Sequence, residues 1–291
     1  MMFEIVTDSS ANLGQTFIEE NGLHILSLSY FIEEEEFASY IPGQKNDLTY
    51  FYEKLHSKAN VRTSLVNVDA ASNQIEGLLK EEKDVLYVGF SSGLSGSFQA
   101  VSIACSDLQE KYQESKIYCV DTLSAAFGEG LLVYYACKLR KEGKSIEETR
   151  DWLEEHKLEL CHWFTVDDLF YLKRGGRIST AAAVFGSALS IKPVMYVDNE
   201  GYLKVYGKAR GRKKSLDEML KNMKETVVNP EEQVFTIAHA DCETDALYMK
   251  EKMSELNPAA IMIEPMEPVI ASHTGPGCIA IFFLGTKREL N

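Results

Sequence analysis

The sequence predicts an α/β fold with two α/β domains, the first with a mostly parallel sheet covered by helices on both faces and the second with a mixed sheet. Three observations predict this. In the first half of the 291-residue chain, short apolar runs rich in β-branched residues alternate with helix-like segments. Farther on, a turn signal at residues 198–201 separates two strand-like runs, which is typical of an antiparallel hairpin. The apolar share of 45% is large enough to fill two cores. We therefore place the domains at residues 1–160 and 161–291.

The elements of the first domain follow from apolar runs and from the polar residues that bound them. Residues 85–90 are apolar and β-favouring, as in a buried strand of a parallel sheet. Asn46 or Asp47 is expected to cap one helix and Ser145 another, because such side chains accept hydrogen bonds from the free amides of a first turn. We predict further strands at 3–7, 24–32, 61–64 and 116–120, helices at 13–20, 47–57, 69–83, 98–108, 125–141 and 145–156, and a solvated acidic turn at 33–36.

The second domain mixes a hairpin with strand–helix units. Ser215 is expected to cap a helix, and residues 269–277 are predicted to form a rigid loop that carries His273 ahead of Gly-Pro-Gly. We predict strands at 162–166, 193–197, 202–206, 234–238, 259–263 and 278–284, and helices at 167–173, 180–189, 215–226 and 244–256.

The composition argues against several classes of protein. Thirty basic residues against 44 acidic ones give a formal charge of −14, which makes a poor general nucleic-acid binder. The six cysteines form no C-x-x-C pair, so we expect buried thiols rather than disulfides or a metal site. No apolar run reaches the ~20 residues that a membrane helix needs, and no signal segment opens the chain. We expect a cytoplasmic protein.

Hydroxyl-bearing and acidic residues follow several of the predicted strands, at 7–10, 63–64, 91–97 and 121–124. The carboxyl ends of parallel strands share one edge of a sheet, where open α/β folds bind ligands. The loop at 91–97 also precedes a helix, whose free amides and partial positive charge suit an oxyanion. Helix caps, or a loop that only turns the chain, would explain the same residues.

A serine-hydrolase site is the main alternative. Ser95, Asp121 and His273 occur in the chain order of the α/β-hydrolase triad. However, the sequence Gly-Leu-Ser-Gly-Ser at 93–97 lacks the last glycine of G-x-S-x-G, and the serine stands beyond the strand end. No phosphate-binding glycine motif and no metal-ligand spacing occurs. The residues by themselves therefore predict an anion site and leave the anion open.

Ordered motifs extend along nearly the whole chain: TDSS at 7–10, TS at 63–64, SSGLSGSFQ at 91–99, residues 121–130, DLFYLKRGGRI at 168–178, KP at 192–193, the basic segment near Arg210, and HTGPG at 273–277. Together they resemble the DegV family, the fatty-acid-binding subunits of bacterial fatty acid kinase. One departure is Leu65-Val66, where the family usually has Gln-Pro.

The resemblance implies a carrier of a long-chain fatty acid, with no catalysis of its own and no cofactor. A separate ATP-dependent kinase subunit would phosphorylate the presented carboxyl group, and the acyl-phosphate would enter phospholipid synthesis. The family's carboxyl-binding residues correspond to Thr63, Ser95 and His273, whose donors could satisfy a buried carboxylate. Their loops would be supported by Ser64, Gly96, Ser124 and Thr274.

Two short basic clusters stand out in this acidic chain. Arginine's planar fork suits phosphate and carboxylate partners, so we expect these arginines to dock the kinase or to meet the phosphoryl group. The alternative is a solvated basic face, which we accept for the lysines at 213 and 214. The arginines are Arg174, Arg177, Arg210 and Arg212.

Overall fold

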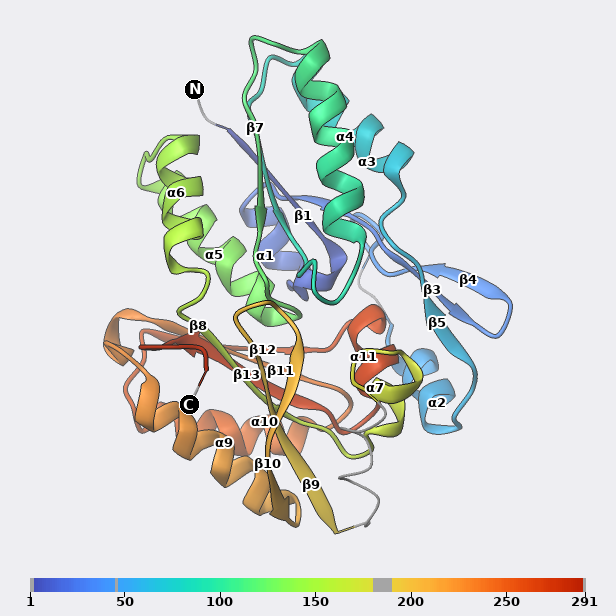
Figure 1. Cartoon of the computed structure of the whole chain (residues 1–291), viewed down its shortest axis with the longest axis vertical. Coiled ribbons are helices and arrows are strands. Elements are labelled where there is room, and N and C mark those ends of the chain that lie inside the picture. The colour runs from blue at the N-terminus through green and yellow to red at the C-terminus, as the bar shows by residue number, and fades with distance from the viewer. Residues whose placement is uncertain (1–2, 45–46, 180–189, 290–291) are drawn as a thin grey trace.

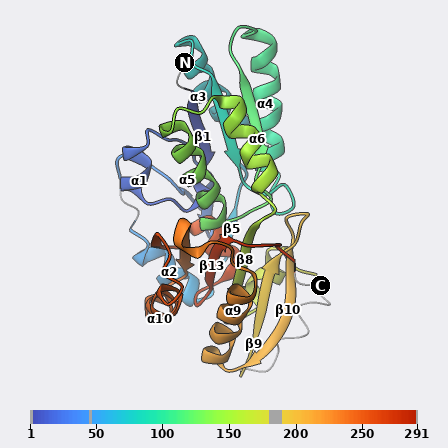
Figure 2. The ribbon, with the colours of Figure 1, turned by 90° about the vertical axis from the view of Figure 1, so that its left-hand side faces the viewer.

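The computed structural model describes residues 3–44, 47–179 and 190–289. Its two large sheets lie one beyond the other along the long axis of the molecule (Figures 1 and 2). The α/β prediction is confirmed, with one parallel and one mixed sheet. The domain division at residue 160 stays a prediction. The helix predicted at 180–189 and the candidate cap Asn46 lie outside the described residues.

The first sheet is parallel, in the order β2-β1-β6-β7. Its strands are β1 (Glu4–Asp8), β2 (His24–Leu26), β6 (Val85–Gly89) and β7 (Ile117–Asp121). Because side chains alternate between the faces of a strand, Val85 and Tyr87 pack with helices on one face, whereas Leu86 and Val88 pack with helices on the other. The first face carries α3 (Val68–Lys80) and α4 (Ser97–Lys111), and the second carries α5 (Phe127–Lys141) and α6 (Ile146–His156) (Figure 1).

The second sheet is mixed, in the order β10-β9-β8-β13-β11-β12. Its strands are β8 (Leu160–Thr165), β9 (Ile191–Val197), β10 (Leu203–Arg210), β11 (Val234–His239), β12 (Ala260–Pro265) and β13 (Ile279–Leu284). Trp163 and Phe283 pack on one face against α9 (Arg212–Thr226) and α10 (Glu243–Ser254). Phe164 and Phe282 lie on the other face, which is turned toward the first half of the chain and α5.

A small antiparallel sheet, β4-β3-β5, corrects the prediction for residues 24–38. Its strands are β3 (Ser29–Ile32), β4 (Glu35–Ala38) and β5 (Val61–Thr63). The single strand predicted at 24–32 is wrong, because the N–H of Leu28 bonds to Ser9 Oγ at 3.0 Å and the chain leaves the first sheet there. The acidic run is only partly a turn, since Glu35 and Glu36 pair with β3. Thr63 therefore does not lie on the edge of the parallel sheet.

Two predictions about helices are wrong, one for the segment that carries His273 and one for Ser215. His273 lies in the last turn of α11 (Pro268–Thr274), not in a loop, because Glu267 accepts hydrogen bonds from two amides of the first turn and starts a helix. Ser215 lies inside α9 and donates to the carbonyl of Arg212, so it is not the cap. The remaining elements are η1 (Ser9–Ala11), α1 (Gln15–Glu20), α2 (Thr49–His56), α7 (Phe170–Arg174) and η3 (Pro230–Glu232).

Three further observations concern the described part of the chain. None of the helices in the described part of the chain has the length and apolar character to cross a membrane. Within the same part, no group of three or more His, Cys, Asp or Glu side chains could hold a metal ion. All six cysteines are free thiols, and four of them are buried.

Candidate functional site

A cavity of about 330 Å³ lies beside the face of the second sheet that carries Phe164 and Phe282. The loops that follow β5, β6 and β7 line its other side. This volume is in the range of small-molecule sites. Most of its lining is apolar, and Phe164, Ala280 and Phe282 supply it from the second sheet. Leu94, Ala125 and Ala126 supply it from the loops of the first half.

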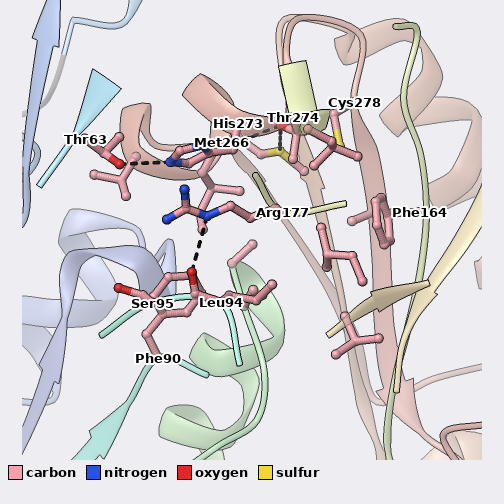
Figure 3. A pocket seen from close by; sticks show the side chains of 18 of the residues that line it. Thr63, Phe90, Leu94, Ser95, Phe164, Arg177, Met266, His273, Thr274 and Cys278 are labelled. Carbon is pink, nitrogen blue, oxygen red and sulfur yellow. Dashed lines mark hydrogen bonds between the residues drawn. The ribbon is translucent and has the colours of Figure 1, made fainter. Parts of the chain in front are cut away.

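The polar end of the cavity is formed where β5 meets α11 (Figure 3). Thr63 Oγ1 and His273 Nε2 share a hydrogen bond of 2.8 Å, although the two residues are 210 positions apart. Burial, together with the smaller effects of the charges of Arg177 and Arg174, lowers the pKa of His273 to about 3. The imidazole is therefore neutral near pH 7 and offers one donor and one acceptor.

Ser95 and Arg177 complete this polar end. Ser95 Oγ lies 3.0 Å from Ser97 Oγ and accepts from the Ser97 N–H, so it is fixed at the start of α4. Arg177 Nε donates to the carbonyl of Leu94 at 3.3 Å, and another guanidinium nitrogen donates to the Gly175 carbonyl. Figure 3 shows the guanidinium between the Thr63–His273 pair and the loop that carries Ser95. The structure thus brings the three predicted carboxyl-binding residues into one cavity, together with Arg177.

The hydrolase triad is not assembled in the described part of the chain. His273 pairs with Thr63, and Ser95 pairs with Ser97. Asp121 accepts instead from the backbone amides of Ser92 and Leu123, at 3.2 and 3.0 Å. This geometry gives the serine-hydrolase hypothesis no support.

Of the four residues predicted to support the site, some line the cavity and others lie outside it. Ser64 and Thr274 line the cavity, and each hydroxyl donates to a backbone carbonyl. Gly96 is the N-terminal cap residue of α4. Ser124 is buried outside the cavity lining and accepts from Arg288.

The departure at residues 65–66 has a structural consequence. Leu65 is half exposed and lines the cavity beside Thr63 and Ser64. The N–H of Val66 donates to Ser97 Oγ at 3.2 Å. A proline at this position has no N–H, so valine allows a link between the β5 loop and the start of α4 that proline would exclude.

Of the four predicted docking arginines, Arg177 alone is among the described residues that line the cavity. Arg174 lies over the rings of Phe170 and Tyr171. The side chain of Arg210 is exposed at the end of β10. Arg212 is ion-paired with Asp245 at 2.8 Å and with a second carboxylate, that of Asp167, at 3.6 Å.

Comparison with known proteins identifies the family. The model described as "Uncharacterised protein, DegV family" matches residues 2–286. The chain belongs to the DegV family. A DegV domain-containing protein of Clostridium perfringens is 44% identical over 290 residues, which cover 99% of each chain. A relative from Streptococcus pyogenes is 34% identical and covers 99% of this chain and 100% of its own.

Solved DegV structures share this fold. A DegV family protein of Thermus thermophilus, described by its fatty acid binding, has a TM-score of 0.88 at 27% identity and covers 98% of this chain and all of its own. Bacillus subtilis DegV, described as a fatty acid binding protein, has a TM-score of 0.84 at 28% identity with the same coverage.

Two groups near the site of this DegV chain were not predicted as site residues. Glu267 caps the helix that carries His273. A proline at the first helical position and Gly275 just after the last one are a sequence signal that could have predicted this helix. His162 lines the cavity as a buried side chain on β8. Its only sequence signal is a polar residue at an inward position of a strand.

Proposed function

We propose that this chain binds a long-chain fatty acid, with the carboxylate held by Thr63, Ser95 and His273 and the tail in the cavity. The observation that carries the proposal is an apolar cavity whose polar end gathers neutral donors from three separate segments. Membership of the DegV family, and the fatty-acid binding described for relatives above 25% identity, support it.

The chemistry of the polar end suits a carboxylate. A buried carboxylate is costly unless several donors satisfy it, and two hydroxyls with a neutral imidazole supply donors without a fixed negative neighbour. The guanidinium of Arg177 adds a positive charge close by. Burial of a dozen methylenes at about 0.8 kcal/mol each would contribute on the order of 10 kcal/mol before association costs.

We further infer that the chain has no catalysis of its own and presents the carboxyl group to a separate ATP-dependent kinase. The acyl-phosphate made there would feed phospholipid synthesis. The product carries more negative charge than the acid, and Arg177 lies where it would offset that charge. Arg210 is exposed outside the cavity and is the better candidate for docking.

The site is tested by the fatty acid that the protein carries from bacterial expression. Extraction and mass spectrometry should find an acyl chain in the wild type and at least a tenfold lower content, roughly, in the Thr63→Ala/Ser95→Ala/His273→Ala triple variant, because the carboxylate loses its donors. Single variants should lose less, since the other donors and water partly compensate. No acyl chain in the wild type, or an equal content in the triple variant, would contradict the proposal.

Arg210→Ala should leave the fatty-acid content unchanged and lower acyl-phosphate formation at sub-saturating kinase and ATP. A charge at the rim of an interface acts mainly on association, so the wild-type rate should also fall with ionic strength. Lys214→Ala, which removes a nearby exposed cation, is the control and should behave as wild type. A wild-type rate for Arg210→Ala at every kinase concentration would remove the docking role.

Gly175→Ala should weaken fatty-acid binding about tenfold, close to the loss of one hydrogen bond. The φ of Gly175 is −72°, so its backbone accepts alanine, but a Cβ there would lie 2.2 Å from His273 Nδ1 and must displace the ring from Thr63. Gly207→Ala is the matched control, because nothing lies within 4 Å of the added Cβ. Unchanged affinity in Gly175→Ala would mean that the position of His273 does not matter for binding.

A further inference from the structure

Ser97 carries a buried hydroxyl group next to Ser95 but does not itself line the cavity. It is the first residue of α4, and it is 0% exposed. Its Oγ has two hydrogen-bond partners, the N–H of Val66 at 3.2 Å and the Oγ of Ser95 at 3.0 Å. Because a buried hydroxyl is costly unless its hydrogen finds an acceptor, the Ser97 hydrogen must go to one of these partners.

The direction of the hydrogen bonds around Ser97 follows from which partner can accept. A backbone N–H only donates, so the Val66 amide cannot take the Ser97 hydrogen. Within the described residues Ser95 Oγ is the other partner, and the Ser97 hydroxyl therefore donates to it. The Ser97 N–H also donates to Ser95 Oγ, at 3.2 Å. Ser95 Oγ thus accepts two hydrogen bonds, which uses both of its lone pairs.

The hydrogen of the Ser95 hydroxyl is the part of this group that remains free. Apart from Ser97, Ser95 Oγ has no hydrogen-bond partner in the described part of the chain. Both donors belong to Ser97, which lies outside the cavity lining, whereas Ser95 is part of it. The two donors therefore approach Ser95 Oγ from the side of α4, and this leaves its hydrogen for a group in the cavity.

A serine held in this way is a better donor than an isolated one. When a hydroxyl oxygen accepts hydrogen bonds, its own O–H is polarised, so that bonds in a chain strengthen one another. An ionised carboxylate only accepts hydrogen bonds, and bonds to a charged acceptor are stronger than those to a neutral one. The chain of bonds from the Val66 N–H through Ser97 to Ser95 thus ends in a donor that suits a carboxylate.

We propose that Ser97 is a positioning residue that fixes Ser95 as a hydrogen-bond donor to the carboxylate of the bound fatty acid. The proposal rests on the proposed function, because that function places the carboxylate at Ser95. Ser97 acts through Ser95 and does not touch the ligand. A residue that only held the β5 loop to the start of α4 would instead change the affinity whether or not the Ser95 hydroxyl is present.

A double-mutant cycle, measured as the affinity of the delipidated protein for stearic acid, separates these two roles. Ser97→Ala should weaken binding about fivefold, because Ser95 loses one of its two donors, and Ser95→Ala should weaken it about tenfold. Ser95→Ala/Ser97→Ala should bind within about twofold of Ser95→Ala, since no Ser95 hydroxyl is left to position. Ser102→Ala is the matched control, because it removes another hydroxyl from α4, outside the cavity lining, and should bind as wild type.

Two conservative variants test whether the hydroxyl of Ser97 is the cause. Ser97→Thr keeps the O–H group and should bind within about twofold of wild type. Ser97→Cys fills similar space with a weak donor and should bind as weakly as Ser97→Ala. Wild-type affinity in Ser97→Cys, or a loss in Ser97→Thr as large as that in Ser97→Ala, would overturn the inference, because packing at residue 97 would then set the affinity.

The cycle also distinguishes failure of this inference from failure of the proposed function. If the losses in Ser95→Ala and Ser97→Ala multiply in the double variant, or if Ser97→Ala binds as wild type, the inference is overturned and the proposed function stands. If Ser95→Ala binds as tightly as wild type, the inference fails together with the part of Ser95 in holding the carboxylate. If the wild type binds no stearic acid, the proposed function itself fails.

Discussion

Arg288→Met is expected to destabilise the protein by about 3–5 kcal/mol, the range for removing one partner from a buried charged network. Arg288 is 1% exposed. Its Nε donates to the Leu160 carbonyl at 2.9 Å, and one terminal nitrogen donates to the carbonyls of Leu123 and Asp198, at 2.7 and 3.2 Å. Burial lowers its pKa to about 10, so it remains charged near pH 7.

The effect should be large because this one side chain joins parts of both sheets. Leu123 follows β7 of the first sheet, Leu160 begins β8 of the second, and Asp198 follows β9. Methionine fills similar space but donates nothing, so each of these carbonyls would lose a buried donor, although that of Asp198 keeps its hydrogen bond from the Gly201 N–H. The neighbouring residues Ala125 and Val197 line the cavity, so the loss should also loosen the site.

Urea unfolding measures the change for Arg288→Met. Lys287→Met is the matched control, because its side chain is the exposed neighbour in sequence, and it should change stability by less than about 0.5 kcal/mol. Arg288→Lys should fall between the two, because a single ammonium cannot reproduce the fork. Equal stability of Arg288→Met and Lys287→Met would show that the network contributes little.

Much of the fold could be predicted from the sequence because its signals are local. The apolar run that became β6 and the cap of α6 are examples, because Ser145 caps this helix as predicted. The split between β2 and β3 has no such signal, since both parts favour strands. It is decided by the bond from Leu28 to Ser9, whose position the local sequence does not specify.

The candidate site likewise contains residues that the sequence predicted and residues that it did not. Thr63, Ser95 and His273 could be named because they stand in recognisable motifs, but the reason given for their meeting was partly wrong. Thr63 belongs to an antiparallel sheet and reaches the site because α11 packs against that sheet. Arg288 could not be found, because its importance comes from carbonyls that only the folded chain brings together.

Glu267→Gln is expected to change how stability depends on pH, by about 3 kcal/mol between pH 5 and pH 8 relative to wild type. Burial raises the pKa of Glu267 to about 7, and the nearby charge of Asp8 acts in the same direction. Hydrogen bonds from Ser39 and from the amides of Val269 and Ile270 oppose this shift without cancelling it.

The sign follows from the folded pKa being higher than the ordinary value of 4.5. Between pH 4.5 and about 7 the folded state binds more protons than the unfolded state, so stability is lost as the pH rises through this window. Glutamine keeps one acceptor for the helix cap and does not titrate. At pH 5 the variant should be the less stable protein, because its NH₂ group faces a backbone donor. At pH 8 the gap should close or reverse, because only the wild type then holds a buried charge.

Thermal unfolding of both proteins in the same buffers from pH 5 to pH 8 measures this difference. Other buried acids such as Asp8 and Glu129, whose pKa values burial also raises, are present in both proteins and largely cancel in the comparison. Glu267 starts α11 and His273 ends it, so the same charge acts on the helix that positions the candidate ligand-binding imidazole. Parallel curves for the two proteins across this range would mean that Glu267 titrates at its ordinary pKa and that its burial is relieved by water.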